Sequence, residues 1–297
     1  MPLNNPVYEN NPFDPDNPVA YENWKAAKLE NYPQNADALI VEVDDPRRLK
    51  PSEHEAILER CNKANMAVYI GKTGDDPDRL IPATLGAQFG LRNLDRNMGA
   101  DDDGITALQV VDDQWRTRYI PYTNRPIHWH TDGYYNSLDQ QIHSLLLHCV
   151  HPAGEGGENA LLDHEIAYIR LRDENPAHIK ALMEPDAMTI PANIEKGSVL
   201  RPARSGPVFS LSHEGRLHMR YTARNHSIEW KNNSQTHAAI AALENLLMSD
   251  DPCIYRLILQ PGWGLISNNV LHDRSGFNDN APHSRLLYRL RYFDRIN

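Results

Sequence analysis

The stretch GWGLISNNVLHDRSGFNDNAPHSRLLYRLRYF, residues 262–293, decides the fold of this chain. A predicted strand, Trp263–Ser267, leads to His272, and a polar turn rich in Asn and Asp follows. A returning strand is predicted from Arg285 onward, because large apolar side chains alternate there with arginines. Two strands joined in this way are typical of antiparallel β structure.

The alternation on the returning strand separates two kinds of side chain. Its even positions are apolar or aromatic, whereas Arg285, Arg289 and Arg291 occupy odd positions and therefore share one face. One interpretation is a charged face in contact with solvent. The other is an anion site inside a barrel, since the guanidinium fork matches a carboxylate in a bidentate way.

Upstream of this stretch, short apolar or alternating runs recur, and turn residues separate most of them. Many short strands of this kind favour a sandwich, a jelly roll or a barrel. The predicted strands are 38–43, 66–70, 105–111, 141–150, 199–201, 207–211, 216–221, 254–259, 263–267 and 285–293. The predicted helices are 20–29, 77–91, 164–173, 236–248 and one that begins at a capping box of Ser52 and Glu55.

No internal repeat and no proline- or serine-rich linker divides the chain. Its 297 residues allow one large domain or two small ones. Hydrophobic residues make up 40% and charged residues 24%, which indicates a globular chain. We expect a single domain over 38–297, preceded by an extended arm with a short helix over 1–37.

Charge and cysteine usage narrow the class of partner. The formal net charge of −10 disfavours nucleic acid and anionic membranes. No run approaches the ~18–20 apolar residues of a membrane span, and the polar N-terminus lacks the features of a signal peptide. The three cysteines are far apart, so they predict neither a disulfide framework nor a metal knuckle. We expect a cytoplasmic protein with no nucleic-acid and no membrane partner.

The segment PIHWHTDGYY, residues 126–135, carries three candidate metal ligands, His128, His130 and Asp132. On a straight strand, residues at i and i+2 share a face ~6.6 Å apart, whereas i and i+4 lie ~13 Å apart. Two of the three side chains can therefore converge on one metal. Either His128 and His130 form the pair, or His130 and Asp132 do.

The two pairs predict different chemistry. The pair of His128 and His130 begins the H-x-H-x-D pattern of binuclear zinc hydrolases, but Gly133 stands where those enzymes carry a further histidine. The pair of His130 and Asp132, with one distant histidine, forms a facial triad. Such a triad holds Fe(II) and leaves three positions open for cosubstrate and oxygen.

Four separate motifs occur in an order and spacing that are specific together. They are W-H-T-D at Trp129–Asp132, G-G-E-N at Gly156–Asn159, a histidine at His272 within N-N-x-L-H-x-R-x-x-F, and R-x-x-x-R at Arg285 and Arg289. With these motifs the chain resembles the Fe(II)/2-oxoglutarate-dependent dioxygenases of the taurine dioxygenase and clavaminate synthase-like superfamily. The resemblance covers roughly residues 109–293 and, more faintly, the start at 38.

The resemblance implies an α+β fold, a double-stranded β-helix (jelly roll) with flanking helices. It also implies that His130, Asp132 and His272 bind Fe(II) and that Arg285 grips the distal carboxylate of 2-oxoglutarate. Asn159 replaces a threonine that helps to bind this cosubstrate, and an amide can still donate a hydrogen bond. With O2, such an enzyme hydroxylates or otherwise oxidatively modifies a C–H bond of its substrate and releases succinate and CO2. A carboxylate ligand rather than Gly or Ala leaves no site for a halide, which favours hydroxylation, or a desaturation or cleavage derived from it, over halogenation.

The substrate implied by the resemblance is a small polar or anionic metabolite. Arg289 stands where some relatives bind an anionic substrate group, and the remaining predicted substrate residues are Tyr134, Tyr135, Arg220 and Arg224. His128 is then either a residue that supports the metal ligands from behind or a wall of the pocket, rather than a ligand. Relatives often form homo-oligomers, so we expect one here. A zinc hydrolase with His128 and His130 and a non-catalytic protein are the alternatives.

Overall fold

The computed structural model describes residues 11–96, 100–112, 116–195, 197–224, 228–279 and 284–297. The chain forms two compact units, which we describe separately. The sheet unit comprises residues 33–132, 140–163 and 252–297. The helical unit comprises the described parts of residues 1–32, 133–139 and 164–251. The predicted division into an arm over 1–37 and a single domain over 38–297 stays a prediction.

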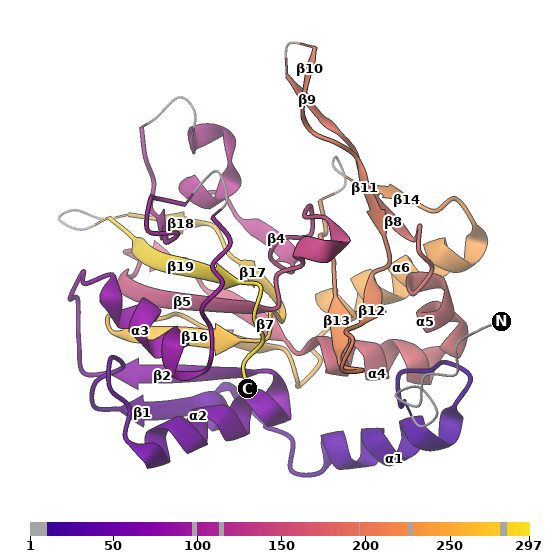
Figure 1. Ribbon diagram of the computed structural model, residues 1–297, viewed down its shortest axis with the longest axis horizontal. Helices are drawn as coiled ribbons and strands as arrows, with labels where there is room; N and C mark the ends of the chain where they lie inside the picture. Colours follow the sequence, from indigo (N-terminus) through magenta and orange to yellow (C-terminus); the bar gives the residue numbers. More distant parts are fainter. Residues whose placement is uncertain (1–10, 97–99, 113–115, 196, 225–227, 280–283) are drawn as a thin grey trace. The chain divides into compact units, whose positions relative to one another are not determined.

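Two β-sheets form the centre of the sheet unit (Figure 1). The six-stranded sheet has the order β1-β2-β16-β5-β19-β3, and the four-stranded sheet has the order β15-β7-β17-β4. Only β1 and β2 run parallel among these pairs. This architecture confirms the predicted α+β class with a double-stranded β-helix core. The strands are β1 (Ile40–Val43), β2 (Met66–Gly71), β3 (Thr106–Leu108), β4 (Ile127–His130), β5 (Ser144–His151), β7 (Asn159–Leu162), β15 (Tyr255–Leu257), β16 (Trp263–Ser267), β17 (Leu271–Arg274) and β19 (Leu286–Tyr292).

Strand β5 lies between β16 and β19 and is buried at all but its last position. Its sequence SLLLHCVH is nearly continuous in apolar residues, which is typical of a strand that is covered on both faces. Helices α2 (Pro51–Ala64) and α3 (Leu80–Gln88) belong to the same unit. They bring Ile57 and Leu85 into one core cluster with Leu146 of β5 and Ile266 of β16. The smaller elements of this unit are η1 (Ala36–Leu39), η2 (Arg116–Arg118), η3 (Ile120–Tyr122), β6 (Glu155–Gly156) and β18 (Phe277–Asn278).

The helical unit contains four α-helices, three of which pack on one another: α4 (His164–Glu174), α5 (Pro176–Leu182) and α6 (Ser234–Met248). The fourth, α1 (Pro18–Leu29), follows a segment that is tied to α4 by the buried Arg172, whose guanidinium donates to the carbonyls of Pro12 and Asp14. Its strands are β8 (Met188–Ile190), β9 (Asn193–Glu195), β10 (Ser198–Arg201), β11 (Arg204–Gly206), β12 (Phe209–Leu211), β13 (Leu217–Met219) and β14 (Glu229–Trp230). The short helix η4 (Leu138–Gln140) spans the boundary between the units. Within the described residues, no helix is both long and apolar enough to cross a membrane.

Helix α2 does not begin at the predicted capping box of Ser52 and Glu55, so that prediction is wrong. The helix begins at Pro51, and the carboxylate of Glu53 accepts the backbone N–H of Lys50 at 2.8 Å. Proline is favoured at the first helical position, because the N–H that it lacks would have no partner there. The helix therefore starts earlier than its serine suggests.

Two other helices differ from the prediction. Helix α3 begins at Leu80 rather than at Pro77, because the carboxylate of Asp78 accepts the backbone N–H of Leu80 at 2.9 Å. Helix α5 was not predicted, although Asn175 caps it by accepting the N–H of Ala177. A helix that follows another so closely has no separate hydrophobic pattern to identify it.

We expect Gly264→Ala to destabilise the protein strongly. A Cβ at this position of β16 would lie 2.3 Å from the Tyr69 ring and 2.4 Å from the carbonyl oxygen of Leu147. Overpacking of this kind costs about 1–3 kcal/mol or more. The matched control is Gly276→Ala, where the nearest heavy atom is 3.6 Å from the added Cβ. Urea denaturation measures both variants, and equal free energies of unfolding would contradict the prediction.

Candidate active site

Three side chains of the sheet unit converge where β4 pairs with β17. His130 ends β4, His272 lies opposite it on β17, and Asp132 follows two residues after His130. One ligand atom of each residue lies within 4.8 Å of those of the other two. The two imidazole rings have centroids 4.2 Å apart, and Asp132 Oδ1 is 3.8 Å from His130 Nε2. The register of one strand pair therefore brings the two histidines together, and the turn after β4 adds the carboxylate.

The backbone orients both imidazoles in the same way. His130 Nδ1 lies 2.9 Å from the carbonyl oxygen of His128, and His272 Nδ1 lies 2.9 Å from that of Val270. A carbonyl only accepts, so Nδ1 carries the hydrogen in each ring and Nε2 keeps its lone pair. Burial, together with the neighbouring His272, lowers the pKa of His130 to about 3. His130 is therefore neutral at pH 7, which is the form that binds a metal.

Asp132 is ionised although it is buried. Burial alone would raise the pKa of its carboxyl, but the guanidiniums of Arg289 and Arg291 outweigh burial and hold this pKa below its usual range. Their Nη1 atoms lie 3.3 Å and 3.9 Å from Asp132 Oδ1. The other oxygen, Oδ2, is buried and has no hydrogen-bond partner among the described residues. A buried carboxylate oxygen without a partner, beside two imidazole lone pairs, fits a divalent cation.

The structure brings together His130 and Asp132 rather than His128 and His130. Strand β4 ends at His130, and the chain then turns, with Gly133 at φ +71°. His128 is exposed, and it contributes only its backbone carbonyl to His130. The straight-strand geometry that allowed both pairs does not apply beyond the end of β4. The zinc-hydrolase alternative is therefore not favoured.

The arginine face of β19 is buried, so the interpretation of a solvent-facing charged side is wrong. Arg285 and Arg291 are 3% and 2% exposed, and Arg289 is half-buried. Arg291 also forms an ion pair with Asp95. Neither Asp95 nor the contact between Arg291 and the carboxylate of Asp132 was predicted from the sequence.

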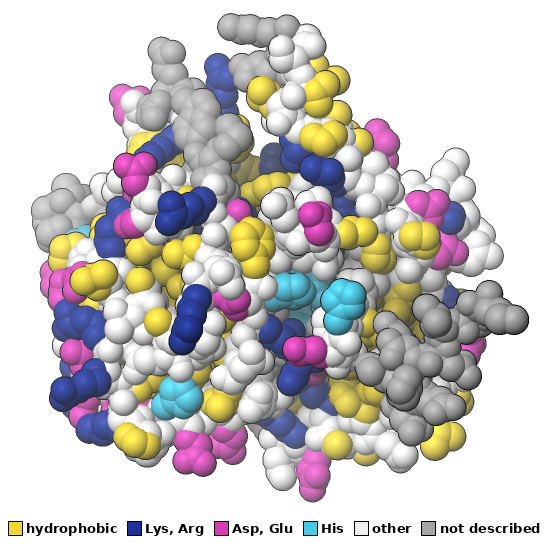
Figure 2. Space-filling model, in the orientation of Figure 1, with side chains coloured by type: hydrophobic (Ala, Val, Ile, Leu, Met, Phe, Trp, Pro, Cys, Tyr) yellow, Lys and Arg dark blue, Asp and Glu magenta, His cyan; other side chains and the backbone are white. Residues whose placement is uncertain are grey.

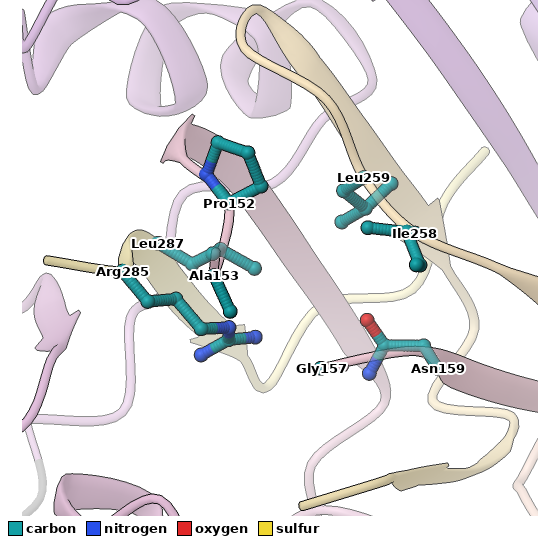
Figure 3. A pocket seen from close by; sticks show the side chains of 8 residues that line it. All are labelled: Pro152, Ala153, Gly157, Asn159, Ile258, Leu259, Arg285 and Leu287. Carbon is teal, nitrogen blue, oxygen red and sulfur yellow. The ribbon is translucent and has the colours of Figure 1, made fainter. Parts of the chain in front are cut away.

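Arg285 faces a pocket of its own in the sheet unit (Figure 3). Its Nη1 atom is buried and has no hydrogen-bond partner within the described part of the chain. Burial lowers the pKa of this guanidinium to about 10, so it stays protonated at neutral pH. A buried cation with an unused donor is suited to bind an anion. The other residues of the pocket are Pro152, Ala153, Gly157, Asn159, Ile258, Leu259 and Leu287.

Asn159 faces the same pocket from the start of β7 (Figure 3). Its Nδ2 donates a hydrogen bond of 2.9 Å to the carbonyl of Asp273, and its Oδ1 is buried without a partner among the described residues. An amide nitrogen carries two hydrogens, so one remains for a ligand. The contact between Asn159 and the cosubstrate stays a prediction.

The remaining predicted substrate residues lie in the helical unit. The rings of Tyr134 and Tyr135 are half-buried and meet edge to face with centroids 5.2 Å apart. Arg224 is exposed. The buried Arg220 donates hydrogen bonds to the backbone carbonyls of Tyr134, Met188 and Arg204, so its guanidinium ties three segments of this unit together.

A solved structure of asparagine oxygenase in complex with Fe(II), 2S,3S-3-hydroxyasparagine and succinate resembles the chain. The TM-score is 0.57 at 13% sequence identity, and the match covers 86% of this chain and 93% of that chain. At this identity the likeness shows the fold alone. It supports the double-stranded β-helix derived above.

Two relatives in sequence are named uridine-5'-phosphate dioxygenase. The relative from Amycolatopsis sp is 31% identical over 169 residues, which are 55% of this chain and 60% of that protein. The relative from Streptomyces sp is 31% identical over 199 residues, which are 64% of this chain and 69% of that protein. The matched region thus spans about three fifths of the first relative's length.

The sequence profile of one family matches residues 44–291. This range contains both strands that bring the histidines together, the Asp132 turn and the pocket of Arg285. The match extends over most of the chain and includes all four motifs. The chain therefore belongs to the taurine catabolism dioxygenase TauD, TfdA family.

Proposed function

We propose that this protein is an Fe(II)- and 2-oxoglutarate-dependent oxygenase that hydroxylates a C–H bond of a small anionic metabolite. The observation that carries the proposal is the convergence of His130, Asp132 and His272 within 4.8 Å. Two neutral nitrogen donors and one carboxylate on one side of a metal are the donor set of non-haem iron oxygenases. Membership of the dioxygenase family agrees with this chemistry.

Each residue of the triad has a distinct task. The Nε2 atoms of His130 and His272 bind Fe(II), and their Nδ1 hydrogen bonds to the backbone keep both rings in place. Asp132 supplies the negative charge, and its unpartnered Oδ2 is available to the metal. Bound there, Fe(II) and 2-oxoglutarate supply the chemistry that adds one oxygen atom of O2 to the substrate and forms succinate and CO2.

The pocket of Arg285 holds the distal carboxylate of 2-oxoglutarate. The support is a protonated guanidinium that is 3% exposed and has an unused donor at Nη1. Leu259 and Leu287 line the same pocket and keep water away from the ion pair, which strengthens it. Asn159 adds an amide hydrogen at the opposite side of the pocket.

The substrate class we propose is a nucleoside 5'-monophosphate. The two relatives at 31% identity bear the name uridine-5'-phosphate dioxygenase, and the phosphate is an anion that needs basic partners. Arg289 supplies one of them. Its guanidinium lies 3.3 Å from Asp132 Oδ1, and its Nε is buried with no hydrogen-bond partner among the described residues, so this donor is available to the substrate.

Four residues of the helical unit, Tyr134, Tyr135, Arg220 and Arg224, remain predicted substrate residues. Tyr134 and Tyr135 offer aromatic surfaces, Arg224 offers an exposed charge, and Arg220 holds the segment of Tyr134 in place. On the face drawn in Figure 2, acidic and basic side chains of the described residues are interspersed. A homo-oligomer and a cytoplasmic location stay predictions.

The first test concerns the metal. We expect Asp132→Ala and His272→Ala to lose Fe(II) and turnover, whereas His128→Ala, the matched control on β4, keeps its iron. Iron per chain is measured after anaerobic reconstitution, with the melting temperature as a check of folding. If His128→Ala lost the metal and Asp132→Ala kept it, the triad would be assigned wrongly.

The second test concerns the two arginines. We expect Arg285→Ala to raise the KM for 2-oxoglutarate by at least ~10-fold, the equivalent of ~1.4 kcal/mol. Arg285→Lys recovers part of the loss, since an ammonium cannot reproduce the guanidinium fork. Arg289→Ala acts mainly on the KM of the primary substrate, and iron per chain is measured in parallel because Arg289 contacts Asp132. If Arg289→Ala raised the KM for 2-oxoglutarate and Arg285→Ala raised that for the primary substrate, the roles of the two arginines would be exchanged.

The third test concerns the substrate. With Fe(II) and 2-oxoglutarate, we expect uridine 5'-monophosphate to stimulate succinate release at least ~10-fold more than uridine, because only the nucleotide engages the basic residues. Equal stimulation by uridine would exclude recognition of the phosphate. If a different anionic metabolite stimulated succinate release and uridine 5'-monophosphate did not, the oxygenase activity would stand and the proposed substrate class would be wrong.

A further inference from the structure

Asn269 lies in the short turn between β16 and β17, close in sequence to His272. It is 2% exposed, and its backbone has φ +51°. Among residues with a side chain, Asn tolerates this left-handed conformation unusually well. Asn269 belongs to the motif around His272, but no role for it was predicted from the sequence.

The carboxamide of Asn269 binds both backbone polar groups of Asp132. Its Oδ1 accepts the N–H of Asp132 at 2.8 Å, and its Nδ2 donates to the carbonyl of Asp132 at 3.0 Å. Nδ2 also donates to the carbonyl of Ile142 at 2.7 Å. A single side chain can do this only if it has an acceptor and two donors, which is the inventory of an amide.

Asp132 needs such an anchor because it lies beyond the end of β4. The pairing of β4 with β17 fixes His130 opposite His272, but Asp132 follows in the turn. Its side chain is also drawn toward the two arginines on β19, at 3.3 Å and 3.9 Å from Oδ1. Fixing both peptide groups around the Asp132 Cα holds the carboxylate in a defined direction against that attraction.

We propose that Asn269 is a positioning residue that sets Asp132 relative to His272 for metal binding. The proposal rests on the function proposed above, in which Asp132 is a metal ligand. The short segment from Asn269 to His272 then carries one ligand directly and orients a second one through its amide. Removing a residue that orients a metal ligand typically weakens metal binding by 10–100-fold.

The test is Asn269→Gly in the full chain. Glycine keeps the left-handed backbone and removes only the carboxamide. We expect Fe(II), titrated anaerobically without 2-oxoglutarate, to bind at least ~10-fold more weakly. Co(II), used as a spectroscopic probe, should give an altered d–d absorption band because the ligand geometry changes. A purely structural role would lower the melting temperature and leave both the affinity and the Co(II) spectrum unchanged.

The matched control is Asn65→Gly. Asn65 is also buried, has φ +57°, and uses its side chain to bond Asp163 and Asn268. It therefore supports the same turn through Asn268 and forms no hydrogen bond to Asp132. We expect it to lower the melting temperature and to leave metal affinity unchanged. Equal loss of affinity in Asn65→Gly and Asn269→Gly would overturn the proposal.

Two further variants keep the outcomes distinct. Asn269→Asp keeps an acceptor for the Asp132 amide but turns a carboxylate oxygen toward two carbonyl oxygens, so we expect metal binding at least as weak as in Asn269→Gly. Normal affinity in this variant would overturn the proposal even if the glycine variant failed to fold. Asp132→Ala in the same titration tests the site itself. If Asp132→Ala binds metal normally, the proposed function fails. If Asp132→Ala loses the metal but Asn269→Gly binds it normally, the positioning role fails and the proposed function stands.

Discussion

The antiparallel pairing of β4 with β17 is the constraint on which the candidate site depends. It places His130 opposite His272 at one register position, so their rings lie with centroids 4.2 Å apart. A shift by one residue would turn one of the two imidazoles to the other face of the sheet. Both strands belong to the four-stranded sheet, in which β17 is held on its other side by β7. The fold therefore contributes to the chemistry mainly through this register.

Charge is distributed around this register in two separate groups. The carboxylate of Asp132 lies between the guanidiniums of Arg289 and Arg291, and Asp95 balances the second of these. Arg285 instead faces its own pocket, where it has an unused donor. The first group keeps a buried carboxylate ionised, and the second keeps a buried cation available to an anion. One strand, β19 with the residue before it, supplies all three guanidiniums.

Several buried polar atoms near these groups have no protein partner among the described residues, namely Asp132 Oδ2, Asn159 Oδ1 and Arg285 Nη1. Leaving a buried polar atom without a hydrogen bond costs about 1–3 kcal/mol, and more for a charged group. Most buried polar atoms in folded proteins are paired, so each exception calls for an explanation such as a bound ion, a water or a ligand. Their placement in the metal cluster and in the Arg285 pocket agrees with an enzyme whose cofactor and cosubstrate supply the missing partners.

The sequence by itself determined the features that depend on local periodicity. The alternation in residues 285–293 predicted β19 and put its arginines on one face, and the apolar run 66–70 predicted β2. The first residues of the helices were predicted less accurately. Helix α2 starts at Pro51, and the carboxylate of Glu53 caps it at Lys50, whereas the sequence predicted a start at Ser52. The motifs indicated the family and named the three residues that the structure brings together.

Tertiary structure decided what spacing left open. Spacing alone allowed His130 to pair with either His128 or Asp132. In the structure β4 ends at His130 and pairs with β17, and the turn that follows brings Asp132 to His130 and His272. The burial of the arginine face and the anchoring of Asp132 by Asn269 also depend on segments that are distant in the sequence. Hydrogen bonds and ion pairs between such segments leave no periodic pattern in either one, so only the folded chain reveals them.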